Sequence, residues 1–270
     1  MWLRRRSKAL AAAAAFALLP ARPSRAFWLG DPGDVLRRGG FSLRPVFEQG
    51  KRRMFETSGH GILAFGGGAV DAERPPADAE VSSHRFYLQG RGGLGGNTEF
   101  FVRAVPGAQR LNFKGSPYNP HMFGGGAGLK WAAPWRAGPV SFGGAASWDW
   151  AYGIQNNTHT YPSHKFLPGG LTTANRRDNV NWTEGALSAG ASFKAREGSS
   201  LYAGYSFLRT KVFWDSGDEV DTYWHLRHEN GAYAGLALRP AAALSILAEF
   251  HFGNERTLAF ALDYNFNVPW

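Results

Sequence analysis

The chain has 270 residues, of which 35 are glycine, 14% are aromatic and none is cysteine, and its formal net charge is +9. The missing cysteines exclude a disulfide framework, a thiolate nucleophile and a cysteine-ligated metal. The basic charge would favour a nucleic-acid partner only if it belonged to the folded part of the protein.

The first predicted element, Met1–Ala26, has the three parts of a secretory signal peptide. Basic residues cluster at positions 4 to 8, an apolar stretch follows at Ala9–Leu19, and Ser24 and Ala26 are the small residues that a signal peptidase reads. The apolar stretch is too short for a retained membrane anchor, which takes about 20 residues. With cleavage after Ala26, 24 basic residues face 21 acidic ones, so the net charge falls to +3 and no nucleic-acid partner is expected.

Residues 27–52 form an N-terminal region whose pattern is ambiguous. Asp31-Pro32-Gly33 is a turn signal, and Arg37–Gly40 is polar and glycine-rich. Phe41–Phe47 alternates apolar and polar residues, but Pro45 argues for an edge strand or for no strand. Three alternatives therefore stay open: a periplasmic extension, a plug in the lumen of a barrel, or an extra strand.

From Met54 onward the sequence alternates with the period of two that is typical of β-strands. No apolar run after residue 26 is long enough for a membrane helix, and a helix-free membrane protein must be a closed barrel, because lipid cannot satisfy an open sheet edge. The sequence predicts an all-β, transmembrane, antiparallel up-and-down β-barrel over residues 53–270, with ten strands in a range of eight to twelve. The expected strands are Met54–Gly66, Val81–Arg91, Thr98–Val105, His121–Ala132, Val140–Gly153, Val180–Lys194, Leu201–Phe213, Thr222–Arg239, Ala243–Phe252 and Leu258–Val268.

The connections between these strands alternate in length. Barrels of this class have short periplasmic turns and longer extracellular loops, so the alternation also predicts the orientation. The predicted short turns are Gly92–Asn97, Ala133–Pro139, Ala195–Ser200 and Pro240–Ala242. The predicted long loops are Gly67–Glu80, Pro106–Pro120, Ile154–Asn179 and Trp214–Asp221, with Gly253–Thr257 as a short exception on the same side.

The last predicted strand places Leu258, Phe260, Leu262, Tyr264, Phe266, Val268 and Trp270 on one face. An amphipathic final strand that ends in an aromatic residue resembles the assembly signal of bacterial outer-membrane β-barrels, with Tyr264, Phe266, Val268 and Trp270 as its residues. The resemblance implies an outer-membrane location, contact with lipid and lipopolysaccharide, and recognition of this strand by the barrel-assembly machinery. No cofactor and no metal is expected, and the oligomeric state stays open.

Most tryptophans lie near predicted strand ends and share the apolar face. Indole rings favour the headgroup level of a bilayer, so these residues are expected to form interface girdles, with a stacking track for sugars or bases as the alternative. The set is Trp131, Trp135, Trp148, Trp150, Trp182, Trp214, Trp224 and Trp270.

On each predicted strand, the residues that alternate with the apolar face point into the barrel, and they include charges of both signs. A ten-strand lumen can be filled by side chains, so these charges are expected to pair and close it, whereas a selectivity lining for a small-solute channel is the alternative. The candidates are Glu56, His60, Arg85, Arg91, Glu99, Arg103, Lys130, Asp149, Glu184, Lys194, His225, Arg227, Glu229, Glu249, His251 and Asp263.

A barrel enzyme with an active site at its extracellular rim is the second alternative. Ser82 and His84 share a strand face, but that face is expected to point to lipid and offers no acidic partner. A loop cluster from Asp215 to His228 is rich in acids and histidines, yet His225 and His228 point to opposite faces of a strand. Gly92–Gly96 lacks the context of a phosphate loop and is expected to be a hairpin turn. The function expected is a structural, surface-contact or narrow-pore role.

Overall fold

The computed structural model describes residues 30–65, 68–73, 78–113, 121–163, 170–196, 198–215, 220–226, 229–253 and 255–266. The described chain is all strand and turn. No helix in it is long and apolar enough to cross a membrane. The strands are β1 (Phe41–Phe65), β2 (Gly68–Glu73), β3 (Asp78–Gly95), β4 (Thr98–Phe113), β5 (His121–Ala132), β6 (Val140–Ser163), β7 (Gly170–Arg196), β8 (Ser199–Asp215), β9 (Val220–Leu226), β10 (Asn230–Ala241), β11 (Leu244–Phe252) and β12 (Glu255–Phe266).

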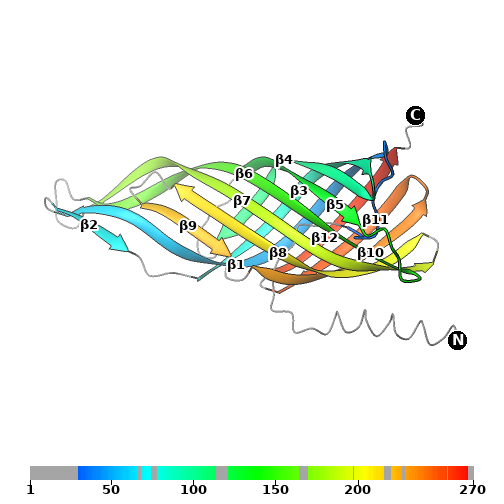
Figure 1. Ribbon diagram of the computed structural model, residues 1–270. Coiled ribbons are helices and arrows are strands. Elements are labelled where there is room, and N and C mark those ends of the chain that lie inside the picture. The colour runs from blue at the N-terminus through cyan, green and yellow to red at the C-terminus, as the bar shows by residue number, and fades with distance from the viewer. Residues whose placement is uncertain are drawn as a thin grey trace.

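These strands form one closed antiparallel barrel (Figure 1). Successive strands pair along the chain, and β1 closes the ring because it pairs with β3 on one edge and with β12 on the other. Phe41 accordingly lies beside both Gly92 and Phe266. In the described part of the chain, ten strands surround the lumen near the short turns: β1, β3 to β8 and β10 to β12. The predicted fold and strand number are confirmed.

The first strand begins at Phe41 and not at Met54, where the alternation becomes regular. Pro45 lies within it, opposite Leu88 of β3. The ladder to β12 is interrupted at Arg44 and Pro45, where proline has no N–H to donate. The strand tolerates this gap because the ladder on its other edge is continuous there, and residues 41–52 are therefore barrel wall.

The outside of the barrel carries a belt of exposed apolar side chains. It begins at the short turns with Phe41, Phe266 and Trp131 and extends to Phe47, Phe86, Phe207 and Phe252. A belt of this kind matches the hydrocarbon of a bilayer, which is about 25 Å tall in such barrels. The protein is therefore a membrane-spanning β-barrel.

Beyond this belt the barrel continues as what we call the distal half, the part past Phe47, Phe86 and Phe207. The outward faces become polar there, at Lys51, Arg53, His84, Arg209 and Lys211. The lumen at this level is filled by a buried apolar cluster: Met54, Val81, Met122, Ala151, Val180, Trp182 and Val212.

Several strands run far past the roughly ten residues that a crossing requires. β1, β6 and β7 have 25, 24 and 27 residues, and Figure 1 shows them extending to the end of the barrel opposite the short turns. The predicted loop Ile154–Asn179 is consequently mostly strand, since β6 and β7 pair from Ile154↔Asn179 to Ser163↔Gly170. Its Asn, Thr, Pro and Gly residues suggested a loop, but each arm supplies the backbone partners of the other.

The predicted strand Thr222–Arg239 is divided into β9 and β10. Both pair with β8, but β9 pairs with β1 whereas β10 pairs with β11. The reason is that β11 and β12 end at the level of Phe252 and Glu255, so beyond them β9 is the strand that closes the ring against β1.

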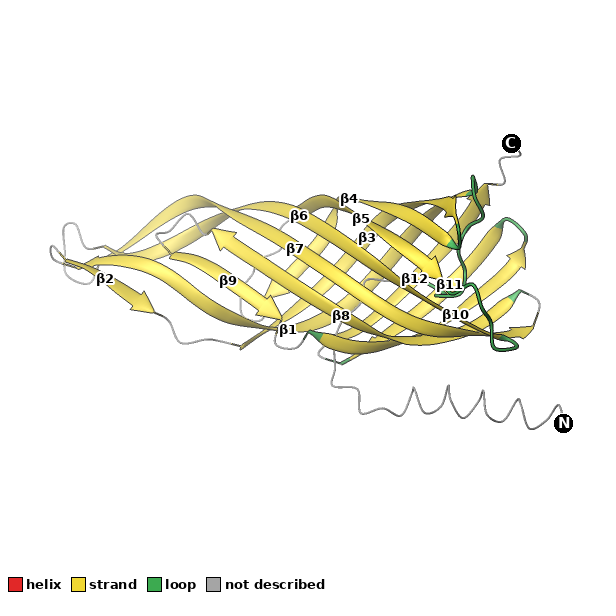
Figure 2. Cartoon of the chain, in the orientation of Figure 1, coloured by secondary structure: helices red, strands yellow, loops and turns green. Residues whose placement is uncertain are grey.

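The short turns lie together at one end of the barrel, beside the loop segments drawn in green in Figure 2. Gly96 and Asn97 form a two-residue hairpin turn between Gly95 and Thr98, and both have positive φ, at 60° and 59°. This is the geometry of a type I′ turn, which glycine and asparagine adopt most easily. The glycine-rich stretch at 92–96 therefore continues β3 into a tight hairpin.

Candidate functional site

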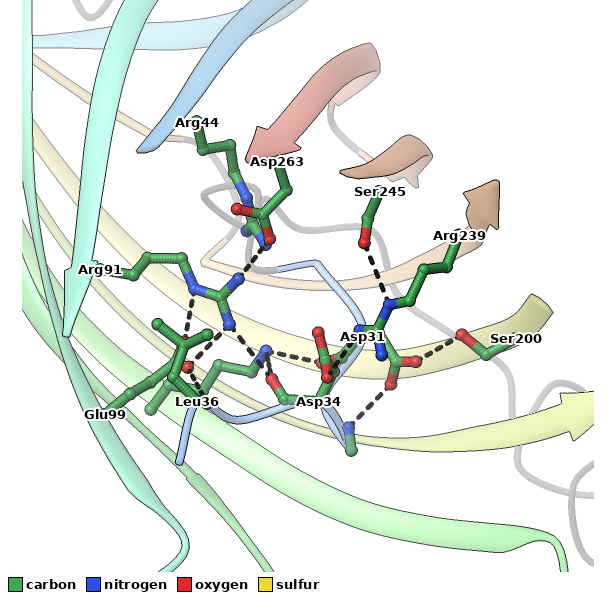
Figure 3. Close-up of polar contacts among 12 residues, drawn as sticks. Asp31, Asp34, Leu36, Arg44, Arg91, Glu99, Ser200, Arg239, Ser245 and Asp263 are labelled. Atoms are coloured by element: carbon green, nitrogen blue, oxygen red, sulfur yellow. Dashed lines mark hydrogen bonds and ion pairs between the residues drawn. The ribbon is translucent and has the colours of Figure 1, made fainter. Parts of the chain in front are cut away.

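The lumen near the short turns holds a buried chain of alternating charges (Figure 3). Arg91 donates two hydrogen bonds to the carboxylate of Glu99, at 2.8 and 2.7 Å. Its third nitrogen reaches Asp263 at 2.5 Å, and Asp263 also accepts from Arg44 at 2.5 Å. The side chains of these four residues are at most 1% exposed. Burial of four charges is tolerable because each one has an opposite partner.

The N-terminal segment, residues 30–40, lies against this chain inside the mouth of the barrel. The backbone N–H of Leu36 donates to Glu99 at 2.8 Å. Lys130 donates from its Nζ to the backbone carbonyls of Asp31 and Asp34, at 2.6 Å each. Glu99 and Lys130 are directly opposite each other on β4 and β5, so these contacts hold the segment from one side of the barrel (Figure 3).

The two aspartates of this segment bind the opposite wall. The Asp31 carboxylate accepts from the hydroxyl of Ser200 and, at 2.9 Å, from the N–H of Gly33. Asp34 accepts from Arg239 at 3.2 Å. Burial alone would raise the pKa of Asp34, but Arg91, Lys130 and Arg239 outweigh it and hold this pKa below the usual 3.8.

Glycines in the wall let the segment approach closely. A Cβ at Gly93 would lie 1.8 Å from the carbonyl oxygen of Arg37, and a Cβ at Gly143 would lie 2.1 Å from that of Pro32. The N–H of Gly39 donates to Gly93 at 3.0 Å, which adds a backbone bond between segment and wall. We call residues 30–40 the plug segment from here on.

A second layer of charges fills the middle of the lumen. Arg103 pairs with Asp149 at 3.0 Å, and its guanidinium lies over the ring of Phe101 at 4.6 Å. Arg85 lies 3.5 Å from Glu184 and 5.0 Å from the centre of the Trp182 ring. These contacts combine charge pairing with cation–π interaction.

The carboxylate of Glu184 is held by further donors. Thr210 donates to it at 2.7 Å, and the indole N–H of Trp182 donates at 3.2 Å. The space between the two pairs is a cavity of about 20 Å³, lined by Arg85, Tyr87, Arg103, Val105, Gly125, Asp149, Trp150, Ala151 and Trp182. A cavity of this size holds about one water molecule.

A third pair lies on β11. His251 Nε2 is 2.7 Å from Glu249, and both side chains are at most 1% exposed. The ring of Tyr233 lies 6.1 Å from His251. Tyr233 lies against the wall where a Cβ at Gly190 or Gly204 would come within 2.4 Å of its hydroxyl, so these glycines make room for the ring.

Ten of the predicted lumen residues are deeply buried: Arg85, Arg91, Glu99, Arg103, Lys130, Asp149, Glu184, Glu249, His251 and Asp263. Lys194 is exposed and lines the mouth at the short turns. His225 is partly buried on β9. The side chains of Glu56 and His60, and the whole of Arg227, lie outside the described residues.

The prediction for Glu229 was wrong. Its side chain is 44% exposed, and its partner at 4.0 Å is Arg209, which is 77% exposed on the outer face of β8. The parity count failed because Glu229 lies in the break between β9 and β10, where the alternation restarts.

Four of the predicted girdle tryptophans are exposed, and a girdle requires this: Trp131, Trp135, Trp148 and Trp150. The girdle prediction was wrong for Trp182, because its side chain is 2% exposed and points into the lumen beside Glu184. The side chains of Trp214 and Trp224, and the whole of Val268 and Trp270, lie outside the described residues. The described residues of the assembly signal, Tyr264 and Phe266, are exposed on β12.

Sequence reasoning missed Asp31, Asp34, Arg44 and Glu48, which all lie in the region left ambiguous. Arg44 and Glu48 follow the inward parity of Ser42 and Val46, and that signal was present in the sequence. The two aspartates had no periodic signal, because the plug segment is not a strand.

The structure describes only part of the candidate enzyme and metal residues. Ser82 and His84 point outward, as their parity predicts, and Ser83 between them is buried. No group of three or more His, Asp or Glu in the described part is placed to hold a metal ion. Most side chains of the Asp215–His228 cluster lie outside the described residues.

No protein-family model and no curated protein matches this sequence. Solved structures do resemble the fold. The attachment invasion locus protein Ail of Yersinia pestis aligns over 85% of this chain and 99% of its own, at 12% identity and a TM-score of 0.33. The outer membrane protease OmpT of Escherichia coli aligns over 84% of this chain and 97% of its own, at 9% identity and a TM-score of 0.38. The Ralstonia pickettii toluene transporter TbuX aligns over 87% of this chain and 91% of its own, at 11% identity and a TM-score of 0.36. Such low values carry no information on activity.

Proposed function

We propose that the protein is an integral outer-membrane β-barrel with a sealed lumen, which anchors and presents the distal half at the cell surface. The lumen is occupied at three successive levels, by the plug segment, by the paired charges and by the apolar cluster around Met54 and Met122. The observation that carries the proposal is the middle layer, where the paired side chains of Arg85 and Arg103 leave a cavity of about 20 Å³ between them. From the described residues we infer that solutes larger than water do not pass this layer.

The surface-contact part of the proposal is supported by the length of the strands. β6 and β7 continue as a paired ribbon to Ser163 and Gly170, well past the partners that β5 and β8 provide. Within the described residues neither edge of this ribbon has a further strand partner, and exposed strand edges are suited to contact other molecules.

The test is conductance in planar lipid bilayers with refolded, full-length protein. We expect the wild type to show no stable unitary conductance. The double variant Arg85→Ser with Arg103→Ser should leak, because it replaces the two long cationic side chains that fill the middle layer with short neutral ones. Arg38→Ser is the control, since Arg38 is exposed at the mouth. Stable wild-type channels would contradict the sealed lumen and would favour a small-solute channel.

A further inference from the structure

A large cavity lies at the mouth of the barrel, on the short-turn side of the plug segment. Its volume is about 720 Å³, which is within the roughly 300–1,000 Å³ of small-molecule sites. It is bounded by the plug segment from Asp31 to Arg37 and by the turns at 133–136 and 198–200. The predicted orientation makes this the periplasmic end.

The lining of this cavity is cationic. Arg37, Arg136, Lys194 and Arg239 line it, against only Asp31 and Asp34. Both acids already have partners, Asp31 in Ser200 and Asp34 in Arg239. Within the described part of the chain no acid pairs with Arg37, Arg136 or Lys194. Three positive charges therefore face the cavity without an acidic partner among the described residues.

The position of these cations separates them from an ordinary solvated surface. Lys194 has the inward parity of its neighbour Ser192, which is buried, so it projects over the mouth and not toward lipid. Arg38, next to Arg37, is also exposed but does not line the cavity. The hydroxyls of Ser141, Ser199 and Ser245 add neutral donors to the same lining.

We propose that this cavity binds a small organic anion through a phosphate or carboxylate group, held by Arg37, Arg136 and Lys194. Guanidinium and ammonium groups form short, charge-assisted hydrogen bonds with both kinds of anion. The anion can be a free solute or the headgroup of an anionic lipid that reaches the rim. The plug segment supplies one wall, so occupation of the cavity would also hold that segment in place.

The first experiment measures binding by calorimetry to full-length protein in a neutral detergent without phospholipid. The probes are glucose 6-phosphate and glucuronate, with glucose as the uncharged control. We expect both anions to bind, glucose not to bind, and affinity to fall as salt is raised from 50 to 500 mM, because screening shortens the reach of exposed charges.

The second experiment compares Arg136→Gln and Lys194→Gln with the control Arg38→Gln, which makes the same charge change outside the cavity. Each cavity variant should weaken binding about three- to tenfold, and the two together should weaken it further. Heat-modifiable mobility on gels confirms that each variant is folded. Equal loss in the control would place the anion elsewhere and overturn the proposed site.

The third experiment separates the two sources of the anion. Protein is placed in nanodiscs of phosphatidylcholine, with or without phosphatidylglycerol. If the anionic lipid competes with glucose 6-phosphate and the cavity variants abolish the competition, the headgroup is a ligand; if it does not compete, the ligand is a free solute. Absence of binding by every probe at 10 mM, in folded wild-type protein, would overturn the proposal.

Discussion

The two halves of this barrel have opposite polarity although the same strands build both. On β1, Phe41, Leu43 and Phe47 point outward in the membrane half, and Arg44 and Glu48 point inward. A few residues later, in the distal half, Lys51 and Arg53 point outward and Met54 points inward.

The difference teaches that the surroundings, and not the fold, decide which face of a strand is apolar. Lipid excludes charges from the outer face, so the membrane half keeps its charges inside and must pair them. Water covers the outer face of the distal half, so that half packs an apolar interior like a soluble barrel. The boundary runs between Phe86 and His84 on β3 and between Phe207 and Arg209 on β8.

The largest effect is expected from breaking the pairing inside the membrane half. Arg91→Met would leave Glu99 and Asp263 buried without their shared partner, and loss of one member of a buried pair costs about 3–5 kcal/mol. The free energy of unfolding from guanidinium titration measures it. Arg38→Met, which is exposed, should change this value by less than about 0.5 kcal/mol. An Arg91→Met protein as stable as the wild type would show that the charges are not a paired seal.

An intermediate effect is expected at the boundary on the outer face of β3. Leu88→Arg places a charge in the lipid belt and should destabilise the protein by up to about 2–4 kcal/mol. His84→Arg is the matched control on the same face, past the boundary, and should change stability little. The folded fraction on unheated gels and the unfolding free energy both report the difference. Equal effects at the two positions would show that no boundary between lipid and water lies between them.

The smallest effect is expected from the pH dependence of the plug segment. Arg91, Lys130 and Arg239 hold the pKa of Asp34 below its usual 3.8 in the folded protein. These interactions therefore contribute stability above that value, which is lost as pH falls through the folded pKa. Because the Asp34 side chain is 37% exposed, the contribution is at most about 1 kcal/mol. Cleavage of the plug segment by an acid-active protease between pH 5 and pH 2, a range that includes the usual pKa and extends below it, measures its release. Asp34→Asn should flatten this profile, and an unchanged profile would exclude Asp34 as the titrating group.

The periodic parts of this barrel were predictable from the sequence, because alternation determines both the strands and the side of each residue. That is why Arg91, Glu99 and Asp263 could be assigned to the lumen. Their pairing was not predictable, since it depends on strand register and on side chains that meet across the ring. The plug segment had no periodic signal, so a plug stayed one of three alternatives. Its contacts run through backbone atoms, such as the N–H of Leu36, and through glycines that let it approach the wall.

The contact between Phe41 and Phe266 joins the first barrel strand to the last, and this has a consequence for folding. A ring that closes between such distant parts of the chain cannot close before β12 has been made. Until β12 is available, β1 and the most recently formed strand both present rows of unpaired N–H and C=O groups, which other chains can join. Pairing at such a long sequence separation is also slow. The chain therefore has to be kept apart from its copies until β12 pairs with β1.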